Sequence, residues 1–275
     1  NIGGLTIGMA VAILIGLWVY DELSFNKYHD NHSRIAQVMT GGHDAKEGAF
    51  TNNSLQYPLA VELQTTYKDN FKHVIRSSWF HEYILTAGEK KISSGGLFMD
   101  PGAPEMFSLE MKSGSWNGLA DPHSIMLSAS TAKTLFGDID PVGQLLVINN
   151  QDNVTVTGVY EDLPTNTQLK EMKFLSAWDL WVSMNGWIKA RATNDWNNHF
   201  LKVYAEIKPG YDFAVVNNNI KNAELQNIRK LEGFQEHIAR SPYVFLQPMD
   251  KWHLYPFKNG VADTKAANMV WLIGI

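Results

Sequence analysis

The first twenty residues of this chain form an uninterrupted apolar run. Residues 1–20 contain no charged side chain, and a helix of that length rises about 30 Å, the thickness of a bilayer core. Trp18 and Tyr20 close the run, and Asp21 and Glu22 follow it. Aromatic side chains favour the membrane–water boundary, and the lack of Lys and Arg after the run fits a non-cytoplasmic exit. The pattern predicts a membrane helix that leads into an extracytoplasmic segment.

Two other structures compete for this run. A cleaved signal peptide needs a basic segment before a shorter apolar stretch, and no Lys or Arg precedes this one. A buried core helix has the same composition and remains an alternative. Gly4, Gly8, Ala12 and Gly16 recur at every fourth position, which places them on one helix face and predicts close packing with another helix. Glycine is also common in membrane helices in general, so the stripe alone supports either interpretation.

The opposite end of the chain becomes apolar again. From Ala266 to Ile275 the only polar side chain is Asn268, and this rise predicts the start of a second span. The residues between the two apolar ends are numerous enough to bury a core of ordinary domain size. We therefore expect an ectodomain held at both ends by membrane helices.

Within the ectodomain, alternating and helical spacings of apolar residues predict two strand–helix–strand units, one near each end. Two such units can pair into one α+β domain that is interrupted by an insertion. The expected elements are a strand at 34–40, a helix at 56–67 and a strand at 71–80, and then a strand at 199–207, a helix at 211–229 and a strand at 243–247.

The middle of the ectodomain has its own pattern. Ser128 is a suitable N-cap for a short helix from Ala129 to Phe136, and Gly137 stands where a left-handed residue usually ends a helix. Alternating residues on both sides of an Asn-rich turn predict a hairpin over 144–160. Four tryptophans crowd the following stretch, which is more typical of a core than of a ligand cage. They are Trp178, Trp181, Trp187 and Trp196.

Composition removes several classes of function. A net charge of −5 argues against nucleic acid as a partner. The absence of cysteine excludes disulfides, thiol catalysis and cysteine-based zinc sites. No G-x-x-x-x-G-K-[ST] phosphate loop occurs, so the chain does not itself cradle ATP phosphates.

Few residues suggest chemistry. His29 and His32, with Asp30 between them, are a conceivable metal pair, but no third ligand accompanies them and a solvated stalk face is favoured. No spacing among the acids near loops marks a glycosidase pair. These acids are Glu105, Glu110, Glu161 and Asp162.

Three blocks of sequence resemble the extracytoplasmic core domain of MacB/FtsX-like ABC-transporter permeases. The first runs from the apolar start through Tyr20-Asp-Glu-Leu-Ser-Phe-Asn-Lys-Tyr-His29. The second contains Leu135-Phe-Gly137, Asp140-Pro-Val-Gly143 and Thr157-Gly-Val159, and the third contains Leu246-Gln-Pro-Met-Asp-Lys-Trp-His-Leu-Tyr255. The chain departs from the family at Asn26, where an acid is usual, and at Gln37, where a basic residue is usual.

The resemblance implies an architecture for the whole chain. It is an α+β, porter-like ectodomain with a small inserted α/β subdomain of the kind called Sabre, preceded by one transmembrane helix and ending at the start of a second. The implied segments are a first membrane helix at 1–21, a first porter-like segment at 22–105, the Sabre-like insertion at 106–164, a second porter-like segment at 165–262 and the start of the second membrane helix at 263–275.

The resemblance also implies a function and partners. The chain would be the non-catalytic permease subunit of an ABC transporter in the bacterial inner membrane, a multi-pass protein in contact with lipid. It would pair with a second permease chain, identical or related, and depend on a cytoplasmic ABC ATPase; a periplasmic adaptor is a further partner that the resemblance allows. No cofactor is implied. A two-helix membrane sensor with a periplasmic ligand-binding domain is the alternative, and a membrane-tethered hydrolase is a third hypothesis.

Overall fold

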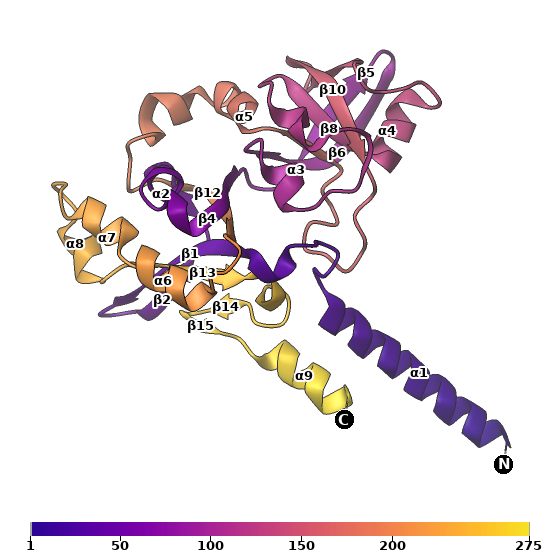
Figure 1. Ribbon diagram of the computed structural model, residues 1–275, viewed down its shortest axis with the longest axis horizontal. Helices are drawn as coiled ribbons and strands as arrows, with labels where there is room; N and C mark the ends of the chain where they lie inside the picture. The colour runs from indigo at the N-terminus through magenta and orange to yellow at the C-terminus, as the bar shows by residue number, and fades with distance from the viewer. Residues whose placement is uncertain (1, 275) are drawn as a thin grey trace.

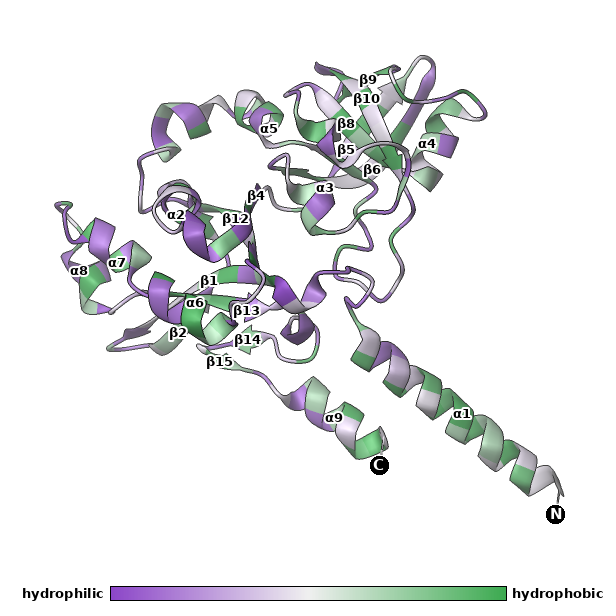
Figure 2. Cartoon of the chain, viewed as in Figure 1, coloured by the Kyte–Doolittle hydropathy of each residue, from purple (hydrophilic) through white to green (hydrophobic). Residues whose placement is uncertain are grey.

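The computed structural model describes residues 2–274 as a two-part α+β ectodomain with two helices on one side (Figure 1). Helix α1 (Ile2–Ser24) precedes the ectodomain and α9 (Lys265–Gly274) follows it. In this part of the chain, one helix is long and apolar enough to cross a membrane, Gly3–Ser24, and none of it is buried. The alternative of a buried core helix is therefore wrong. Figure 2 shows apolar residues along nearly all of α1, and its leucines and isoleucines between positions 5 and 17 are exposed.

The first set of strands contains both predicted strand–helix–strand units. Its strands run in the order β4-β12-β1-β13, so the two units alternate within one antiparallel sheet. In this sheet, strands of the two units are hydrogen-bonded neighbours. The strands are β1 (Ile35–Asp44), β2 (Gly48–Asn52), β3 (Leu55–Gln56), β4 (Phe71–Ser77), β12 (His199–Ile207) and β13 (Tyr243–Pro248), and the helices are α2 (Tyr57–Thr65), α6 (Phe213–Ile220), α7 (Ala223–Ile228) and α8 (Gln235–Ala239).

One predicted helix of this set is divided. The sequence predicts a single helix over 211–229, whereas α6 ends at Ile220 and α7 begins at Ala223. The carbonyl oxygen of Lys221, which lies between the two helices, accepts a hydrogen bond from the backbone N–H of Val244 in β13. In a continuous helix this oxygen would instead accept from an N–H group of the next helical turn. Three consecutive asparagines before the break have low helix propensity, so the sheet contact prevails.

The second set of strands runs in the order β11-β8-β10-β9-β5-β6. It joins the first set where Ser77 of β4 pairs with Met99 of β6. The predicted hairpin is β9 and β10, and the predicted short helix is α4, capped by Ser128 and ended by Gly137 at a φ of 64°. The strands are β5 (His81–Ala87), β6 (Lys90–Met99), β7 (Met111–Gly114), β8 (Ser124–Ser128), β9 (Leu145–Ile148), β10 (Asp152–Tyr160) and β11 (Phe174–Ala177), and the helices are α3 (Ala103–Met106), α4 (Ala129–Phe136) and α5 (Trp178–Met184).

Strand pairing in this set extends beyond the segment 106–164. Strands β5 and β6 precede that segment and β11 follows it, yet all three pair within the same sheet. The two large apolar clusters also draw on both sets of strands, since Trp178 packs in one cluster with β12 and Tyr204 packs in the other with β6. The crowded tryptophans lie in or against the first cluster, as predicted.

The remaining elements are short. A small hairpin, β14 (Phe257–Lys258) and β15 (Val261–Ala262), precedes α9. The short helical turns are η1 (His32–Arg34), η2 (Lys68–Asn70), η3 (Trp116–Leu119), the π-helical η4 (Ile188–Ala192) and η5 (Met249–Lys251). Turns η1 and η5 contact each other at the side of the ectodomain from which α1 and α9 extend.

Candidate functional site: the junction between the helices and the ectodomain

The chain leaves α1 through a turn at Asn26. This residue has a φ of 66° and is almost completely buried. Asparagine tolerates the left-handed region better than most residues, because its short polar side chain can bond locally. Its backbone N–H donates to the carbonyl oxygen of Asn166 at 2.8 Å, and the side-chain amide of Asn166 donates to the hydroxyl of Ser24 at 3.1 Å. The end of α1 is thereby attached to the loop that follows β10.

The side chain of Asn26 joins two more segments. Its Nδ2 donates to the carbonyl oxygen of Met249 at 3.2 Å, and its Oδ1 accepts from the backbone N–H of Gln168 at 2.8 Å and from the hydroxyl of Thr167 at 3.1 Å. A carboxylate at this position could accept both of the latter bonds but could not donate to Met249. The hydrogen bonds around position 26 therefore require an amide and not the acid that is usual there in the family that the sequence resembles.

His29 is fully buried beside this turn. Its Nδ1 lies 2.7 Å from the carbonyl oxygen of Phe107, which can only accept, so Nδ1 carries the hydrogen. Its Nε2, which then carries no hydrogen, lies 3.0 Å from the hydroxyl of Thr167, whose single hydrogen points either to Nε2 or to Oδ1 of Asn26. Burial lowers the pKa of His29 to about 4, so the ring is neutral at physiological pH. The expected solvated stalk face is wrong for His29, because its ring fills the space between α1 and the segment that follows α3.

His32 points to a different partner. Its Nδ1 lies 2.6 Å from Oδ1 of Asp250 in η5. The two histidines therefore do not converge, and no group of three or more His, Asp or Glu side chains within residues 2–274 is arranged to hold a metal.

The segment after β13 is held to the end of α1 by a further contact. Glu22 accepts from Nε2 of His253 at 2.7 Å, and the ring of Phe25 stacks on the ring of His253 with centroids 3.9 Å apart. Trp252 donates its indole N–H to the carbonyl oxygen of Gln247 at 2.8 Å, which connects this segment to β13. A movement of α1 would thus act directly on a strand of the sheet.

Helix α9 begins at the same place. Ala267 and Val270 are buried against Trp18, Val19 and Leu23 of α1. Further along α9, a Cβ built on residue 274 would lie 3.4 Å from Cγ1 of Val19. The two helices are therefore antiparallel neighbours where they meet the ectodomain, and both share one attachment.

A cluster of charged side chains around buried Glu206 connects this junction to α3. Glu206 of β12 is fully buried, and its carboxylate lies 3.0 Å from Arg34 and 3.8 Å from Lys72. Lys72 also pairs with Glu105 of α3 at 2.8 Å, and this hydrogen bond holds the pKa of Glu105 below its usual value. The cluster links the first set of strands to a helix of the second.

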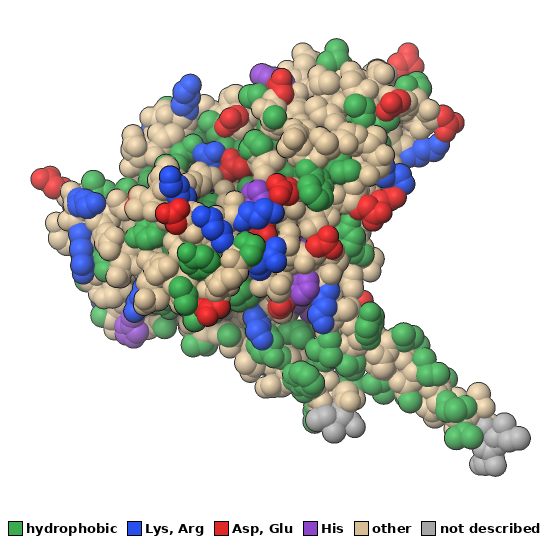
Figure 3. All heavy atoms as spheres, viewed as in Figure 1, with side chains coloured by type: hydrophobic (Ala, Val, Ile, Leu, Met, Phe, Trp, Pro, Cys, Tyr) green, Lys and Arg blue, Asp and Glu red, His purple; other side chains and the backbone are tan. Residues whose placement is uncertain are grey.

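The small-residue stripe occupies the part of α1 that extends away from the ectodomain. Gly4, Gly8, Ala12 and Gly16 are all exposed, and Cβ atoms added at Gly8 or Gly16 would meet nothing within 4 Å. Val19 and Leu23 continue this face seven residues after Ala12 and Gly16 and contact α9, whereas helix packing at the four stripe positions remains a prediction. Figure 3 shows charged side chains spread over the ectodomain, with apolar side chains along α1.

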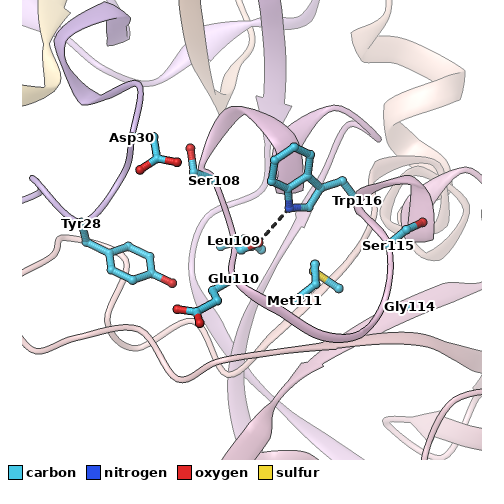
Figure 4. Close-up of a pocket in the computed structure, with 9 residues that line it drawn as sticks. All are labelled: Tyr28, Asp30, Ser108, Leu109, Glu110, Met111, Gly114, Ser115 and Trp116. Atoms are coloured by element: carbon cyan, nitrogen blue, oxygen red, sulfur yellow. Dashed lines mark hydrogen bonds between the residues drawn. The ribbon is translucent and has the colours of Figure 1, made fainter.

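A surface hollow of about 580 Å³ lies beside the junction (Figure 4). Tyr28 and Asp30 line one side, and Glu110 and Trp116 line the other. The indole of Trp116 donates to the carbonyl oxygen of Leu109 at 2.7 Å, which fixes the wall. Partial burial is the largest cause of the raised pKa of Tyr28. The lining offers two carboxylates, Asp30 and Glu110, and two serine hydroxyls, Ser108 and Ser115.

Sequence reasoning missed the central residues of this junction. Asn26 and His29 belong to a short polar stretch that has no periodicity, so they read as a solvated stalk. Their partners Thr167 and Met249 are more than a hundred positions away in the chain. The available signal in this stretch was that each of the two polar residues directly follows an aromatic one, Asn26 after Phe25 and His29 after Tyr28.

Comparison with known proteins yields one family. The model of the MacB-like periplasmic core domain matches residues 1–223. No curated protein sequence matches significantly. A domain of a putative permease protein from Porphyromonas gingivalis has a TM-score of 0.62 at 19% identity, and the match covers 89% of this chain and 98% of that one.

Two further solved structures have the same fold. The periplasmic region of MacB from Actinobacillus actinomycetemcomitans has a TM-score of 0.50 at 13% identity, covering 79% of this chain and 90% of that one. The extracellular domain of the noncanonic ABC-type transporter YknZ from Gram-positive bacteria has a TM-score of 0.51 at 14% identity, covering 78% and 99%. At these identities the likeness establishes the fold.

Proposed function

Because the chain belongs to the family of MacB-like periplasmic core domains, we propose that it transmits ATP-driven movement of membrane helices to the periplasmic side of an ABC transporter permease. The observation that carries this proposal is the shared attachment of α1 and α9 to one junction, through Asn26, His253 and the buried contact of Val270 with α1. A change in the tilt or separation of the helices must therefore be taken up by the ectodomain.

The energy for this movement comes from another chain or domain. The sequence contains no phosphate loop, so a cytoplasmic ABC ATPase is the proposed partner. The second membrane span that α9 begins, a multi-pass location in the inner membrane and a periplasmic adaptor belong to the same proposal. In this proposal the rigid parts of the ectodomain are the porter-like sheet and the Sabre-like insertion, and the insertion comprises residues 106–164.

A reversible cross-link between the two helices tests transmission. Cysteines replacing Val19 and Gly274 would be neighbours in a chain that otherwise has no cysteine. In the full-length permease, reconstituted with its ATPase in liposomes, oxidation should reduce ATP hydrolysis severalfold, and a reductant should restore it. Each single cysteine variant is the matched control. Unchanged ATP hydrolysis in fully cross-linked protein would contradict the proposal. ATP hydrolysis by the permease without any partner or fused nucleotide-binding domain would contradict it as well.

The stripe on α1 provides the proposed permease–permease contact. Replacing Gly8 and Ala12 together by Leu should weaken dimerisation, because larger side chains keep two helix backbones apart. Ala10→Leu on the opposite face is the matched control. Dimer fraction is measured by energy transfer between labelled chains in nanodiscs. Equal energy transfer in the stripe variant and the control would show that this face is not the interface.

A further inference from the structure

A second pocket of about 290 Å³ lies on the face of the β4-β12-β1-β13 sheet that is turned away from α2 and α6. Gln37 of β1 pairs in register with Tyr204 of β12 on one side and with Gln247 of β13 on the other. These three side chains therefore form a row across the sheet and line the same pocket. Of these three residues, only Gln247 also takes part in the junction, through its backbone carbonyl oxygen.

The pocket is rich in amide groups that have no protein partner. Within residues 2–274, the side chains of Gln37, Asn53 and Gln168 make no hydrogen bond to protein, although all three line the pocket. Gln247 uses its amide nitrogen on the carbonyl oxygen of Tyr255 at 3.0 Å. Each free amide offers both an acceptor and two donors, which is the combination that hydroxyl groups of a ligand require.

The charge in the pocket is positive. No Asp or Glu lines it, whereas Lys202 does. The ammonium group of Lys202 lies 4.6 Å above the ring of Trp79 and has no carboxylate partner in the described part of the chain. Burial lowers the pKa of Lys202, because a partly desolvated ammonium lacks a counter-charge. A ligand with one carboxylate would supply that charge.

Aromatic walls limit what else the ligand can be. Tyr204 and Trp252 pack against each other at 5.6 Å between centroids, and Phe257 lies at the rim. Ring faces carry partial negative charge and favour the C–H face of a saturated ring. An extended peptide would need a free strand edge. Strands β1 and β12 are paired on each side, and in the edge strand β13 the N–H groups of Val244 and Leu246 already donate to Lys221 and Asn217.

We propose that this pocket binds a sugar acid, a hydroxyl-rich ring of monosaccharide size that carries a single carboxylate. Lys202 pairs with the carboxylate, the amides of Gln37, Asn53 and Gln168 bind the hydroxyls, and the aromatic wall takes the apolar face of the ring. The volume of about 290 Å³ accommodates one such unit.

The pocket also borders the junction. The backbone N–H of Gln168 donates to Asn26 at the end of α1, and Trp252 adjoins His253, which pairs with Glu22. An occupant would therefore contact two segments that hold the membrane helices. This consequence for the helices rests on the proposed function, whereas binding itself does not.

The test uses the full chain in phospholipid nanodiscs, free of glycoside detergents that would compete for the site. Glucuronate, glucose and tetraglycine are titrated separately, and binding is followed by saturation-transfer NMR. We expect saturable binding of glucuronate, and binding of glucose about tenfold weaker because it lacks the charge-assisted contact. Lys202→Met should weaken glucuronate to the level of glucose, and Gln37→Ala should weaken both sugars.

Lys208→Met is the matched control, because Lys208 follows β12 and faces Asp69 outside the pocket. It should leave glucuronate binding unchanged. The proposal is overturned if glucuronate does not bind saturably, if Lys202→Met and Gln37→Ala leave its affinity unchanged in folded protein, or if tetraglycine binds as tightly. Because no nucleotide or ATPase enters this assay, its failure is distinct from a failure of helix-driven transmission.

Discussion

Asn26→Ala is expected to destabilise the junction more than any other single truncation there. The substitution removes the amide donor from the carbonyl oxygen of Met249, which keeps the backbone N–H of Trp252, and removes the acceptor from the backbone N–H of Gln168. Each of these two lost hydrogen bonds costs about 1 kcal/mol. Forcing alanine to a φ of 66° adds about 1 kcal/mol.

Together these effects should lower the free energy of unfolding by about 3 kcal/mol. For a domain of this size that is about 10 °C in Tm. The assay is thermal unfolding of the full chain in nanodiscs, followed by near-ultraviolet circular dichroism. Asn26→Gly removes the same hydrogen bonds without the left-handed penalty, so it should be about 1 kcal/mol more stable than Asn26→Ala.

Asn150→Ala is the matched control for the backbone effect. Asn150 has a φ of 56°, is exposed, and makes no side-chain hydrogen bond within the described residues. It should lose only about 1 kcal/mol. If Asn26→Ala lowers the free energy of unfolding by no more than Asn150→Ala does, the role of Asn26 in joining α1 to the loop at 166–168 and to η5 is refuted.

Three further predictions concern stability. The pKa of His29 is about 4 in the folded state and 6.5 unfolded, so the unfolded state binds more protons and stability should fall by about 3 kcal/mol as pH drops from about 6.5 towards 4; denaturant titrations at several pH values should show this slope, and His29→Gln should flatten it. Arg34→Met should cost about 2–3 kcal/mol because buried Glu206 loses its nearest cation, and adding Glu206→Leu should recover most of that loss; a double mutant less stable than Arg34→Met would contradict the pairing. Gly96→Ala should cost about 2 kcal/mol, because its Cβ would lie 2.4 Å from the ring of Phe174, and an unchanged midpoint in urea would show that the ring moves freely.

The elements that the sequence predicted well are those with a local cause. Helix α4 occupies Ala129–Phe136 as expected, because its cap at Ser128 and its left-handed end at Gly137 are chemical properties of single residues. The strand at 199–207 is likewise β12 with the same bounds. The apolar run of α1 needed no partner to be recognised. Local spacing and capping chemistry act within a few residues, so one sequence suffices to see them.

The sequence also supported the pairing of the two strand–helix–strand units, although it could not give their alternation as β4-β12-β1-β13. The sequence could not show which strands belong to the second set, because these strands pair with partners far away in the chain. Strand β6 pairs with β11 and β8 pairs with β10, across loops of different length. Which of several compatible edges a strand chooses depends on the packing of both faces.

By itself, the sequence determined the candidate membrane helix, the α+β class, the family resemblance and the absence of a phosphate loop. Only the tertiary structure decided that His29 is buried, that Asn26 bonds to Met249 across more than two hundred residues, and that Gln37 faces a pocket. The reason is physical. The hydropathy of a segment is a sum over its own residues, whereas the burial and hydrogen bonding of a polar side chain depend on which distant segments pack around it.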